Sequence, residues 1–463
     1  MGWGDTRVGW GTQVRIRNWA GLALGVSLLV LWGSTDRQVV GATSRKPIES
    51  EGVARHMRIA KAPVDQDRPN ILVIMTDDQR ASSDGLEVMD NLQRLFGDEG
   101  TYFPNAVATT PLCCPSRASI FTGKYVHNHG VTTQKNATNM PQTWTMQYQL
   151  KQQGYTTALV GKYLNNWSGS KPHFDYAKSG IFTNYYNSAG KYTTHVQTDM
   201  ATDLLETFEA NDDKPWLMYV YPFAPHTPSI PETKYENAYV PPWNDNPART
   251  ETDLSDKPTY IRNRANKTAP VSEQKALRQD MIRTLYSVDD MVGTIFNKLD
   301  ASGEDNTIAF FLSDNGWMWF EHRLDRKEVA YDDSVQIPMF VRWPGQVTEG
   351  ATDSRIVANI DVAPTVYDAA GITPQGYNPD GKSMFTSKRD HILTEFRANN
   401  PWKALWHPDW MYAEYDNGFR EYYGPDDPWQ LHNDFKTEGP PSNAAQLSTT
   451  LREDWACSGA SCP

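Results

Sequence analysis

The strongest constraint on the fold of this 463-residue chain is a set of apolar runs that each end in polar residues. Continuous apolar runs of this length are typical of strands buried on both faces of a parallel sheet. Between two of them, residues 275–300 carry apolar side chains at every third or fourth position, which predicts a helix. This alternation predicts an α/β fold with a large, mainly parallel sheet and helices on both faces. The runs are NILVIMTDDQ, YTTALVGKYLN, WLMYVYPFAPH, NTIAFFLSDNG and IPMFVRWPG.

The pattern changes after Asp380. HILTEF and WMYAEYDNGFREYYG have the features of short strands, and the second contains a hairpin turn at residues 416–418. A turn-rich stretch, PDDPWQLHND, follows. We therefore expect a large domain over residues 69–385 and a smaller C-terminal α+β subdomain with an antiparallel sheet over residues 386–463.

The first 42 residues have the features of an export signal. Three arginines precede the apolar run WAGLALGVSLLVLW, which is shorter than the roughly 20 apolar residues that a membrane span needs. The stretch VVGA then supplies small residues suited to cleavage. We expect a signal peptide or an N-terminal anchor over residues 1–42, a linker over residues 43–68, and a secreted or extracytoplasmic protein.

Two of the four cysteines, Cys457 and Cys462, stand close to the C-terminus. Outside the cytoplasm disulfides persist, so these two thiols could close a small loop. The alternative is a pair of free surface thiols. We expect the bridge.

The bulk composition narrows the class of protein. Contents of 39% hydrophobic and 22% charged residues are those of a globular chain. A net charge of -12 argues against a general nucleic-acid binder, because phosphate binding needs an excess of Lys and Arg. Aromatic residues make up 12% of the chain, which fits either an aromatic-rich core or stacking on sugar or aryl rings. The Trp residues of NNPWKALWHPDW are compatible with sugar binding.

Polar residues follow the predicted strands at the points where the strands end. Ligands of parallel sheets bind beyond the carboxyl ends of the strands, so these side chains should converge. The acids of TDDQ or the Asp-Asn pair of SDNG, taken alone, are more commonly helix caps or turn residues. Together they offer only oxygen ligands, which suit Ca²⁺ or Mg²⁺ better than zinc. The converging residues are Asp77, Asp78, Lys162, His226, Asp314 and Asn315.

Positive groups are expected at the same edge of the sheet. Lys162, His226 and a Lys or Arg from HRLDRKE would add several hydrogen-bond donors. Each of these residues alone is more commonly a solvated surface group or an ordinary loop residue. Combined with a cation, they form the kind of site that holds an oxyanion and stabilises a transferring group.

Two adjacent cysteines precede Pro-Ser-Arg in the stretch TTPLCCPSRASIFTGKY. Adjacent cysteines are poor partners for a disulfide, so another property must account for at least one of them. The stretch resembles the signature of the type I sulfatases of the alkaline-phosphatase-like superfamily, which is Cys or Ser, any residue, Pro-Ser-Arg and then a Thr-Gly pair. Pro115 stands two places after Cys113, so Cys113 occupies the signature position and Cys114 the variable one. The resemblance runs from about Asn70 to Asn433 and includes TDDQ, GKYLN, APHTP, SDNG and VRWPG.

The resemblance implies that a formylglycine-generating enzyme oxidises Cys113 to formylglycine, whose aldehyde hydrates to a geminal diol. The need for such a group follows from its chemistry. A Ser that attacked a sulfate ester would remain as a stable alkyl sulfate, whereas a diol can expel sulfate as its carbonyl re-forms. Residues 69–385 would then be the catalytic domain of a sulfuric ester hydrolase.

The resemblance also implies a metal site. Asp77, Asp78, Asp314 and Asn315 correspond to the ligands of a Ca²⁺ that also contacts residue 113, and Mg²⁺ is the less favoured ion. Such an ion would lower the pKa of the diol and polarise the sulfate oxygens.

Five further residues receive roles from the resemblance. Arg117 corresponds to the Arg that positions the diol, and Lys124 to a residue that supports the diol from behind. Lys162 and Lys327 match the lysines that hold the sulfate. His226 matches the His that can protonate the leaving oxygen.

One departure concerns the substrate. Many arylsulfatases carry a His two residues after the Lys aligned with Lys162, where this chain has Leu164. GKYLN and CCPSR are closer to the N-acetylglucosamine-6-sulfatase and extracellular heparan-sulfatase branch. This favours a sulfated sugar, such as a 6-O-sulfated glucosamine, with an aryl sulfate as the alternative, and leaves open which group deprotonates the diol. We expect no nucleic-acid partner and no stable membrane partner.

Other functions remain in competition. A phosphomonoester or phosphonate hydrolase of the same fold would use the same metal and oxyanion groups. A secreted protein that binds sulfated glycans without the modification at residue 113 is a candidate from another class. A cysteine phosphatase fails on spacing, because neither cysteine has an Arg six residues later.

Overall fold

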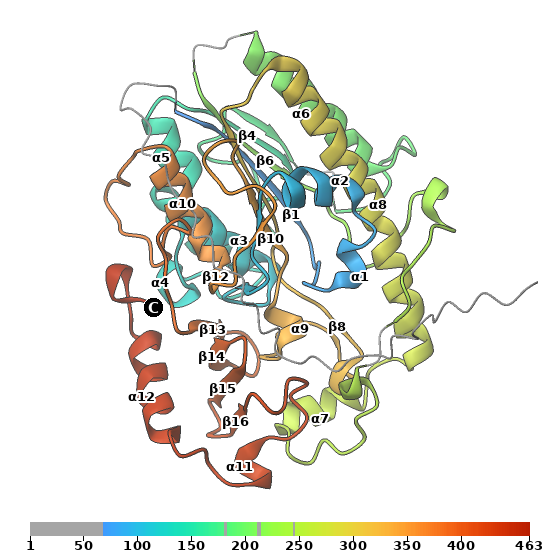
Figure 1. Cartoon of the computed structure of the whole chain (residues 1–463), viewed down its shortest axis with the longest axis vertical. Coiled ribbons are helices and arrows are strands. Elements are labelled where there is room, and N and C mark those ends of the chain that lie inside the picture. Colours follow the sequence, from blue (N-terminus) through green and yellow to red (C-terminus); the bar gives the residue numbers. More distant parts are fainter. Residues whose placement is uncertain (1–67, 180–182, 211–213, 244–245) are drawn as a thin grey trace, which may run out of the picture. The chain divides into compact units, whose positions relative to one another are not determined.

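An eight-stranded sheet forms the centre of the computed structural model (Figure 1). The described residues are 68–179, 183–210, 214–243 and 246–463. The predicted export signal and, except for Arg68, the predicted linker lie outside them. The strands, in spatial order, are β11 (Ala351–Thr352), β2 (Thr101–Tyr102), β10 (Met339–Arg342), β7 (Thr307–Ser313), β1 (Asn70–Thr76), β6 (Trp216–Tyr221), β4 (Thr156–Gly161) and β5 (Tyr176–Lys178).

The middle of this sheet is parallel, as the apolar runs predict. β1 pairs in parallel with both β6 and β7, and β6 pairs in parallel with β4. Every residue of β1, β6 and β7 is buried, which explains why these strands read as unbroken apolar runs. β10, the strand of IPMFVRWPG, instead runs antiparallel to β7 and β2.

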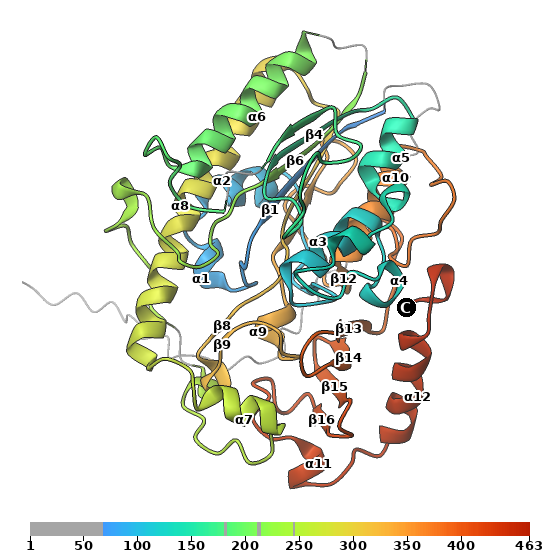
Figure 2. The same ribbon diagram turned by 180° about the vertical axis from the view of Figure 1, so that it is seen from behind.

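Helices cover both faces of the sheet, and the side chains of β1 alternate between two cores. Ile71, Val73 and Met75 pack on the face covered by α3 (Cys113–Thr122), α5 (Met146–Gln152) and α10 (Val362–Ala369). Leu72 and Ile74 pack on the other face, which α6 (Thr193–Glu209) and α8 (Val271–Ser302) cover. Figures 1 and 2 show α6 and α8 on one side of the sheet and α3, α5 and α10 on the other. α8 contains the helix predicted at residues 275–300.

Shorter elements lie around the sheet. Within the described part of the chain, every helix is too short or too polar to cross a bilayer. Two small sheets pair β3 (Ala106–Val107) with β12 (Val357–Ala358) and β8 (Met318–Trp319) with β9 (Asp325–Arg326). The remaining α-helices are α1 (Ser83–Leu86), α2 (Asp90–Leu92), α4 (Val126–His129), α7 (Thr259–Ala265), α9 (Asp332–Val335), α11 (Asp434–Thr437) and α12 (Ala444–Trp455).

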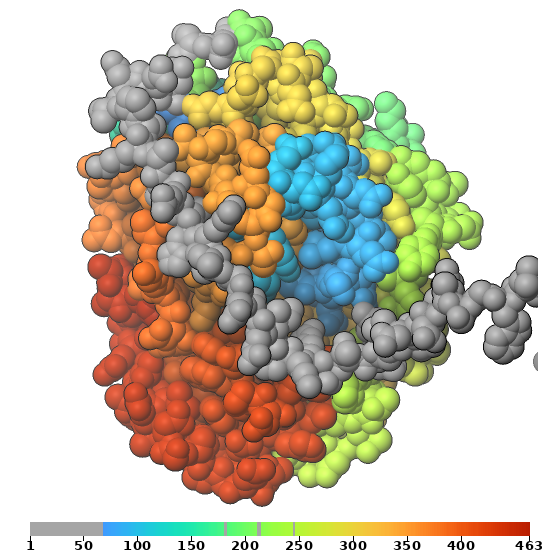
Figure 3. All heavy atoms as spheres, in the orientation of Figure 1, coloured from blue at the N-terminus to red at the C-terminus, as the bar shows by residue number. Residues whose placement is uncertain are grey.

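The C-terminal part forms a four-stranded antiparallel sheet, as predicted, and the hairpin at residues 416–418 joins its last two strands. Its core also takes in residues of the large domain, such as Val107 and Tyr331, so the boundary near residue 386 stays a prediction. On the face in Figure 3, the C-terminal residues (red) lie directly beneath the residues that precede them in the large domain (orange). The strands are β13 (Ile392–Phe396), β14 (Trp402–His407), β15 (Trp410–Tyr415) and β16 (Arg420–Tyr423).

The strand β14 corrects the interpretation of NNPWKALWHPDW as a sugar-stacking stretch. Trp402 and Trp406 are buried, and their indole N–H groups donate to the Glu328 carbonyl at 3.2 Å and to Asp332 Oδ1 at 3.0 Å. These two rings therefore belong to an aromatic-rich core.

The predicted disulfide between Cys457 and Cys462 is present, and the Cys457 carbonyl lies 3.1 Å from Nε2 of His127 on α4. Gly459 N donates to Asp380 Oδ1 at 2.6 Å, and Asp380 Oδ2 accepts from Tyr125 N at 2.9 Å. The C-terminal loop and the residues that follow α3 thus share one buried carboxylate.

Helix α3 begins at Cys113 and is buried along its whole length. It ends at Thr122 and is capped by Gly123, whose φ of 65° is a left-handed conformation that glycine adopts at little cost. His129 supports it from α4: its Nδ1 accepts from Val131 N at 3.0 Å, so its Nε2 carries the proton and donates to Ser119 Oγ at 3.0 Å. The imidazole is therefore neutral, and both of its ring nitrogens have hydrogen-bond partners.

This neutral imidazole predicts a loss of stability in acid. Burial lowers the pKa of His129 to about 3, whereas an unfolded His titrates near 6.5. Between these values the unfolded chain binds the additional proton, so the free energy of unfolding falls as the pH falls, by about 1.4 kcal/mol per pH unit. In urea titrations from pH 7 to pH 4, His129→Gln should flatten this slope by that amount. His432→Gln, at an exposed position, is the control, and equal slopes for all three proteins would contradict the prediction.

Candidate functional site

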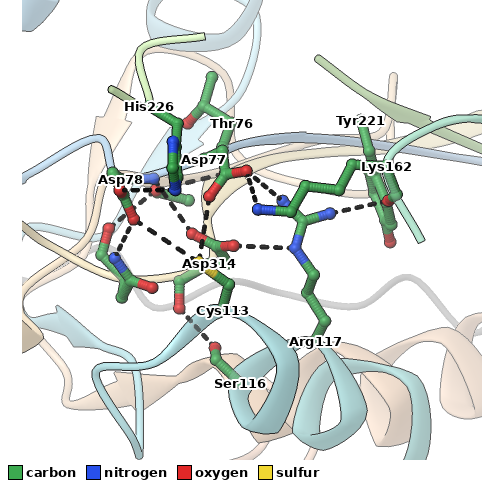
Figure 4. A network of polar contacts seen from close by, with 12 residues as sticks. Thr76, Asp77, Asp78, Cys113, Ser116, Arg117, Lys162, Tyr221, His226 and Asp314 are labelled. Atoms are coloured by element: carbon green, nitrogen blue, oxygen red, sulfur yellow. Dashed lines mark hydrogen bonds and ion pairs between the residues drawn. The ribbon is translucent and has the colours of Figure 1, made fainter. Parts of the chain in front are cut away.

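The carboxyl ends of four parallel strands bring the predicted polar residues together (Figure 4). Asp77 and Asp78 directly follow β1, and Asp314 follows β7. Lys162 follows β4, and His226 stands on the loop after β6. The first residue of α3, Cys113, faces this edge from below the strands in Figure 4.

Three buried carboxylates form the centre of the group. Ligand atoms of Asp77, Asp78, Asp314 and Cys113 all lie within 4.8 Å of one another. Asp78 has a φ of 72°, and its backbone N–H donates to Asp314 Oδ1 at 3.1 Å. Asn315 Nδ2 donates to Asp78 Oδ1 at 2.7 Å, whereas Asp78 Oδ2 is buried without a hydrogen-bond partner. These acidic residues are placed so that they could hold a metal ion.

The two adjacent cysteines face different surroundings. Sγ of Cys113 lies 3.3 Å from Asp77 Oδ1 and 2.8 Å from Lys327 Nζ. Sγ of Cys114 lies in the apolar core, and its polar contact is the Asn165 carbonyl at 4.0 Å. Burial raises the pKa of the Cys114 thiol to about 11. Burial, followed by the negative charge of Asp77, also raises the pKa of Cys113, so the unmodified thiol stays protonated at neutral pH.

Three cations offset the three carboxylates. Arg117 is fully buried, and its Nε donates to Asp314 Oδ2 at 2.8 Å while its Nη1 donates to the Lys162 carbonyl at 2.8 Å. The Lys162 ammonium contacts Asp77 Oδ2. The Lys327 ammonium contacts Asp78 and donates to Asn315 Oδ1 at 3.2 Å.

The charges shift the pKa values of these groups in both directions. Burial alone would raise the pKa of Asp77, but the charges of Lys162 and His226 outweigh it and hold that pKa well below its usual value. Burial, together with the Asp77 charge, raises the pKa of Asp314. For Lys327, the attraction of Asp78 exceeds the effect of burial and raises its pKa well above the usual value. The site is a dense set of mutually compensated charges.

His226 stands at the open side of the group, since 27% of its side chain is exposed. Its Nδ1 donates to the Thr227 carbonyl at 2.6 Å, and its Nε2 lies 3.7 Å from Asp78 Oδ2. Its own carbonyl accepts from the Tyr185 hydroxyl at 2.7 Å. These contacts fix the imidazole with Nε2 directed at the carboxylates.

Lys124 is the predicted residue that the structure does not bring into this group. It stands beyond the C-terminal end of α3, whereas Cys113 begins that helix. Its ammonium pairs with Asp380 at 2.9 Å and lies 5.6 Å from the Trp144 ring centroid. Lys124 therefore ties α3 to the loop that carries Asp380.

Sequence reasoning missed the residues that hold the site in place. The Ser116 hydroxyl donates to the Asp314 carbonyl and accepts from Asn359 Nδ2 at 2.9 Å. The Arg264 guanidinium, from α7, donates to the Lys327 carbonyl at 2.6 Å and to the Asp325 carbonyl. Ser116 lies inside the signature and could have been suspected. Asn359 and Arg264 are far away in sequence and carry no local signal.

The segment that carries Lys327 has an unusual backbone. Arg326 and Glu328, on either side of Lys327, have φ values of 66° and 79°, which non-glycine residues adopt only at a cost in energy. The two hydrogen bonds from Arg264, and one from the Trp402 indole to the Glu328 carbonyl, hold this conformation.

Taken together, the mainly parallel sheet, the small antiparallel sheet and the group of acids and cations at the strand ends define the alkaline-phosphatase-like class. The chain matches the Sulfatase family model over residues 69–372. It belongs to the sulfatase family.

Curated relatives agree with this assignment. The chain is 32% identical over 349 residues to an extracellular sulfatase SULF-1 homolog of Drosophila melanogaster, covering 68% of this chain and 31% of that protein. It is 30% identical over 369 residues to the N-acetylglucosamine-6-sulfatase of Homo sapiens, covering 72% of this chain and 66% of that protein. The match thus spans 31% of the length of the first relative and 66% of the length of the second.

Solved structures share the fold. A structure of BT4656 in complex with its substrate D-glucosamine-2-N,6-O-disulfate has a TM-score of 0.69 at 24% identity, over 84% of this chain and 97% of that one. The phosphonate monoester hydrolase of Silicibacter pomeroyi has a TM-score of 0.67 at 18% identity, over 83% and 94% of the two chains.

The role of Arg264 in holding the Lys327 segment can be tested by substitution. Arg264→Gln should lower the free energy of unfolding by about 2–4 kcal/mol, because a hydrogen bond from a charged group contributes about 1.5–3 kcal/mol. Amide hydrogen exchange of residues 323–329 should become faster. Arg262→Gln, on the same helix, removes only a bond to Thr259 Oγ1 and should change stability by less than about 0.5 kcal/mol. Unchanged exchange in Arg264→Gln would refute this role.

Proposed function

We propose that this protein hydrolyses sulfate esters to an alcohol and inorganic sulfate, with residue 113 as the nucleophile after its oxidation to formylglycine. The observation that carries the proposal is the different placement of the two cysteines. Cys113 Sγ lies 3.3 Å from Asp77 Oδ1 and 2.8 Å from Lys327 Nζ, whereas Cys114 packs in the core. Membership of the sulfatase family over residues 69–372 supports the reaction class.

The metal that we propose is Ca²⁺, held by Asp77, Asp78, Asp314 and Asn315. All four offer oxygen donors, and a hard cation would satisfy the buried Asp78 Oδ2 that lacks a hydrogen-bond partner. When bound, such an ion polarises sulfate oxygens and lowers the pKa of a hydroxyl group beside it.

Hydrated formylglycine at residue 113 would supply a geminal diol, of which one hydroxyl accepts the sulfuryl group while the other later loses its proton as the carbonyl re-forms and sulfate leaves. Arg117 would orient residue 113, since it is fixed by Asp314 and by the Lys162 carbonyl. Lys162 and Lys327 would bind the sulfate oxygens. His226, protonated at both ring nitrogens, would keep its Nδ1 hydrogen bond to the Thr227 carbonyl and donate the Nε2 proton to the leaving alcohol oxygen.

We propose that the substrate is a sulfated sugar, with 6-O-sulfated glucosamine as the first candidate and an aryl sulfate as the alternative. The names of the relatives support this choice: one is an N-acetylglucosamine-6-sulfatase, and BT4656 has D-glucosamine-2-N,6-O-disulfate as its substrate. A formylglycine-generating enzyme would be the maturation partner.

We further propose that the protein acts outside the cytoplasm. The Cys457–Cys462 disulfide supports an oxidising compartment. A relative named as an extracellular sulfatase supports the same location.

A phosphonate monoester hydrolase is the second candidate, because one such enzyme shares the fold with a TM-score of 0.67. The same cations would hold a phosphonate group. Comparing the sulfate, phosphate and phenylphosphonate esters of 4-nitrophenol separates the two functions.

The assignment of residue 113 predicts unequal effects of two neighbouring substitutions. Cys113→Ala should reduce kcat/KM for a sulfate ester by on the order of 10³-fold or more, because the nucleophile is lost. Cys114→Ala, the matched control, should retain most of the activity, because its side chain packs in the core. Equal losses would refute the assignment. Mass spectrometry of the peptide that contains residue 113 should find an aldehyde there, with sulfur replaced by oxygen and two hydrogens lost, and an unchanged thiol at residue 114.

The metal assignment predicts a calcium-dependent stability that does not require activity. At one hundred times its Kd, Ca²⁺ should raise the free energy of unfolding by about 2.7 kcal/mol, which thermal unfolding detects as a higher Tm. Asp314→Asn should lose this shift, since it removes a charged ligand. Asp290→Asn alters the surface group of His195, Glu232 and Asp290 and should keep the shift. A full shift in Asp314→Asn would exclude this ligand set.

A further inference from the structure

A polar groove of about 600 Å³ lies beside the segment that carries Lys327. Its walls are α7, residues 325–328 and the loop between β13 and β14, and we call it the α7 groove. Figures 1 and 2 show α7 below β8 and next to β16. The rings of Tyr260 and Tyr415 are 5.8 Å apart. Its polar lining includes Asn263, Arg264, Lys267, Arg326, Asn399 and Asn400.

The groove and the sulfate-binding group share one short segment of chain. The Lys327 ammonium contacts Asp78 and Cys113 Sγ, so this side chain belongs to the site. Its neighbours Arg326 and Glu328 line the groove instead. Arg264, which also lines the groove, donates to the Lys327 carbonyl at 2.6 Å, so the groove adjoins the backbone of a residue that would hold the sulfate.

The charge of the groove differs from that of the whole chain. The chain has a net charge of -12, whereas the lining of the groove has three cations, Arg264, Lys267 and Arg326, and two acids. Lys267 and Arg326 are exposed in the groove, and 72% of the Arg326 side chain is accessible. The two acids in the lining are Asp325 and Glu328. A carboxylate oxygen of Asp325 lies 3.8 Å from Arg264 Nε, and the other lies 3.5 Å from Arg326 Nε.

The other lining groups suit hydroxyl-rich ligands. The side-chain amides of Asn263, Asn399 and Asn400 can each donate and accept, as neighbouring sugar hydroxyls require. Phe396 and Tyr260 add aromatic carbon surface. A volume of about 600 Å³ is within the usual range of ligand sites, about 300–1,000 Å³.

We propose that the α7 groove binds the next unit of an anionic, sulfated oligosaccharide while the terminal sulfate ester lies at residue 113. Lys267 and Arg326 bind the carboxylate or sulfate of that unit, and the three asparagines bind its hydroxyl groups. The proposal rests on the proposed sulfatase function, and it deepens that function by making the preferred substrate a chain of charged sugars and not a single sugar.

The test compares two substrates of the same enzyme sample. The first is N-acetylglucosamine 6-sulfate, and the second is a tetrasaccharide of alternating uronic acid and glucosamine that carries 6-sulfated N-acetylglucosamine at its non-reducing end. The readout is the ratio of kcat/KM for the tetrasaccharide to kcat/KM for the monosaccharide. This ratio does not depend on the fraction of enzyme that is folded or modified.

The double variant Lys267→Gln/Arg326→Gln should lower this ratio at least tenfold. The control Arg262→Gln removes a cation from the same helix outside the groove and should leave the ratio unchanged. The ratio of the wild-type enzyme should also fall as NaCl is raised, because salt screens exposed charges. A ratio for the double variant within twofold of the wild-type value would overturn the proposal.

A binding measurement separates this proposal from the proposed function. Titration calorimetry with the tetrasaccharide uses Cys113→Ala with and without the two groove substitutions, so no turnover is needed. The groove substitutions should weaken binding at least tenfold, and equal affinities would refute the groove. Wild-type enzyme that cleaves neither ester would instead refute the sulfatase function, and the binding result would still decide the role of the groove.

Discussion

The structure depends on compensation between buried carboxylates and buried cations. Asp77, Asp78 and Asp314 lie out of contact with solvent, and each contacts a positive group from another part of the chain. Removing one member of a buried ion pair costs about 3–5 kcal/mol, because the partner is left buried and uncompensated. Each charge of the group is therefore needed, because its loss would leave an oppositely charged partner buried and unpaired. A divalent ion added to these three acids and three cations would give the pocket a positive excess suited to an oxyanion.

Helix α3 links this charged group to the rest of the fold. Its first residue is Cys113 and its second turn carries Arg117, so one rigid element sets both positions. Its C-terminal end is fixed by Asp380, which also binds Lys124 and the backbone of the C-terminal disulfide loop. Residues after 380 thus help to place α3: Gly459 N donates to Asp380 at 2.6 Å, and Glu395 N donates to the Thr109 carbonyl at 2.8 Å. The C-terminal sheet has a similar role for Lys327, through Trp402.

How far the sequence predicted the fold can be seen from individual elements. The apolar runs gave β1, β4, β6 and β7 because strands buried on both faces must be apolar at every position. β14 was missed because its tryptophans suggested a surface for sugars, and only packing against the neighbouring strands shows that Trp402 and Trp406 are core residues. The direction of β10 was likewise beyond the sequence, since an apolar run does not encode the orientation of its partner.

The sequence by itself determined which groups meet at the carboxyl edge of the sheet. Asp77, Lys162, His226 and Asp314 directly follow or lie close behind buried parallel strands, and the carboxyl ends of such strands must share one edge. Only the tertiary structure decided which residues hold those groups in position: Arg264 on the Lys327 carbonyl, Asn359 on Ser116, and Asp380 on Lys124. These contacts join segments far apart in the chain, so no local pattern of residue types records them. The α7 groove could not be predicted either, because its walls come from three segments that are separate in the sequence.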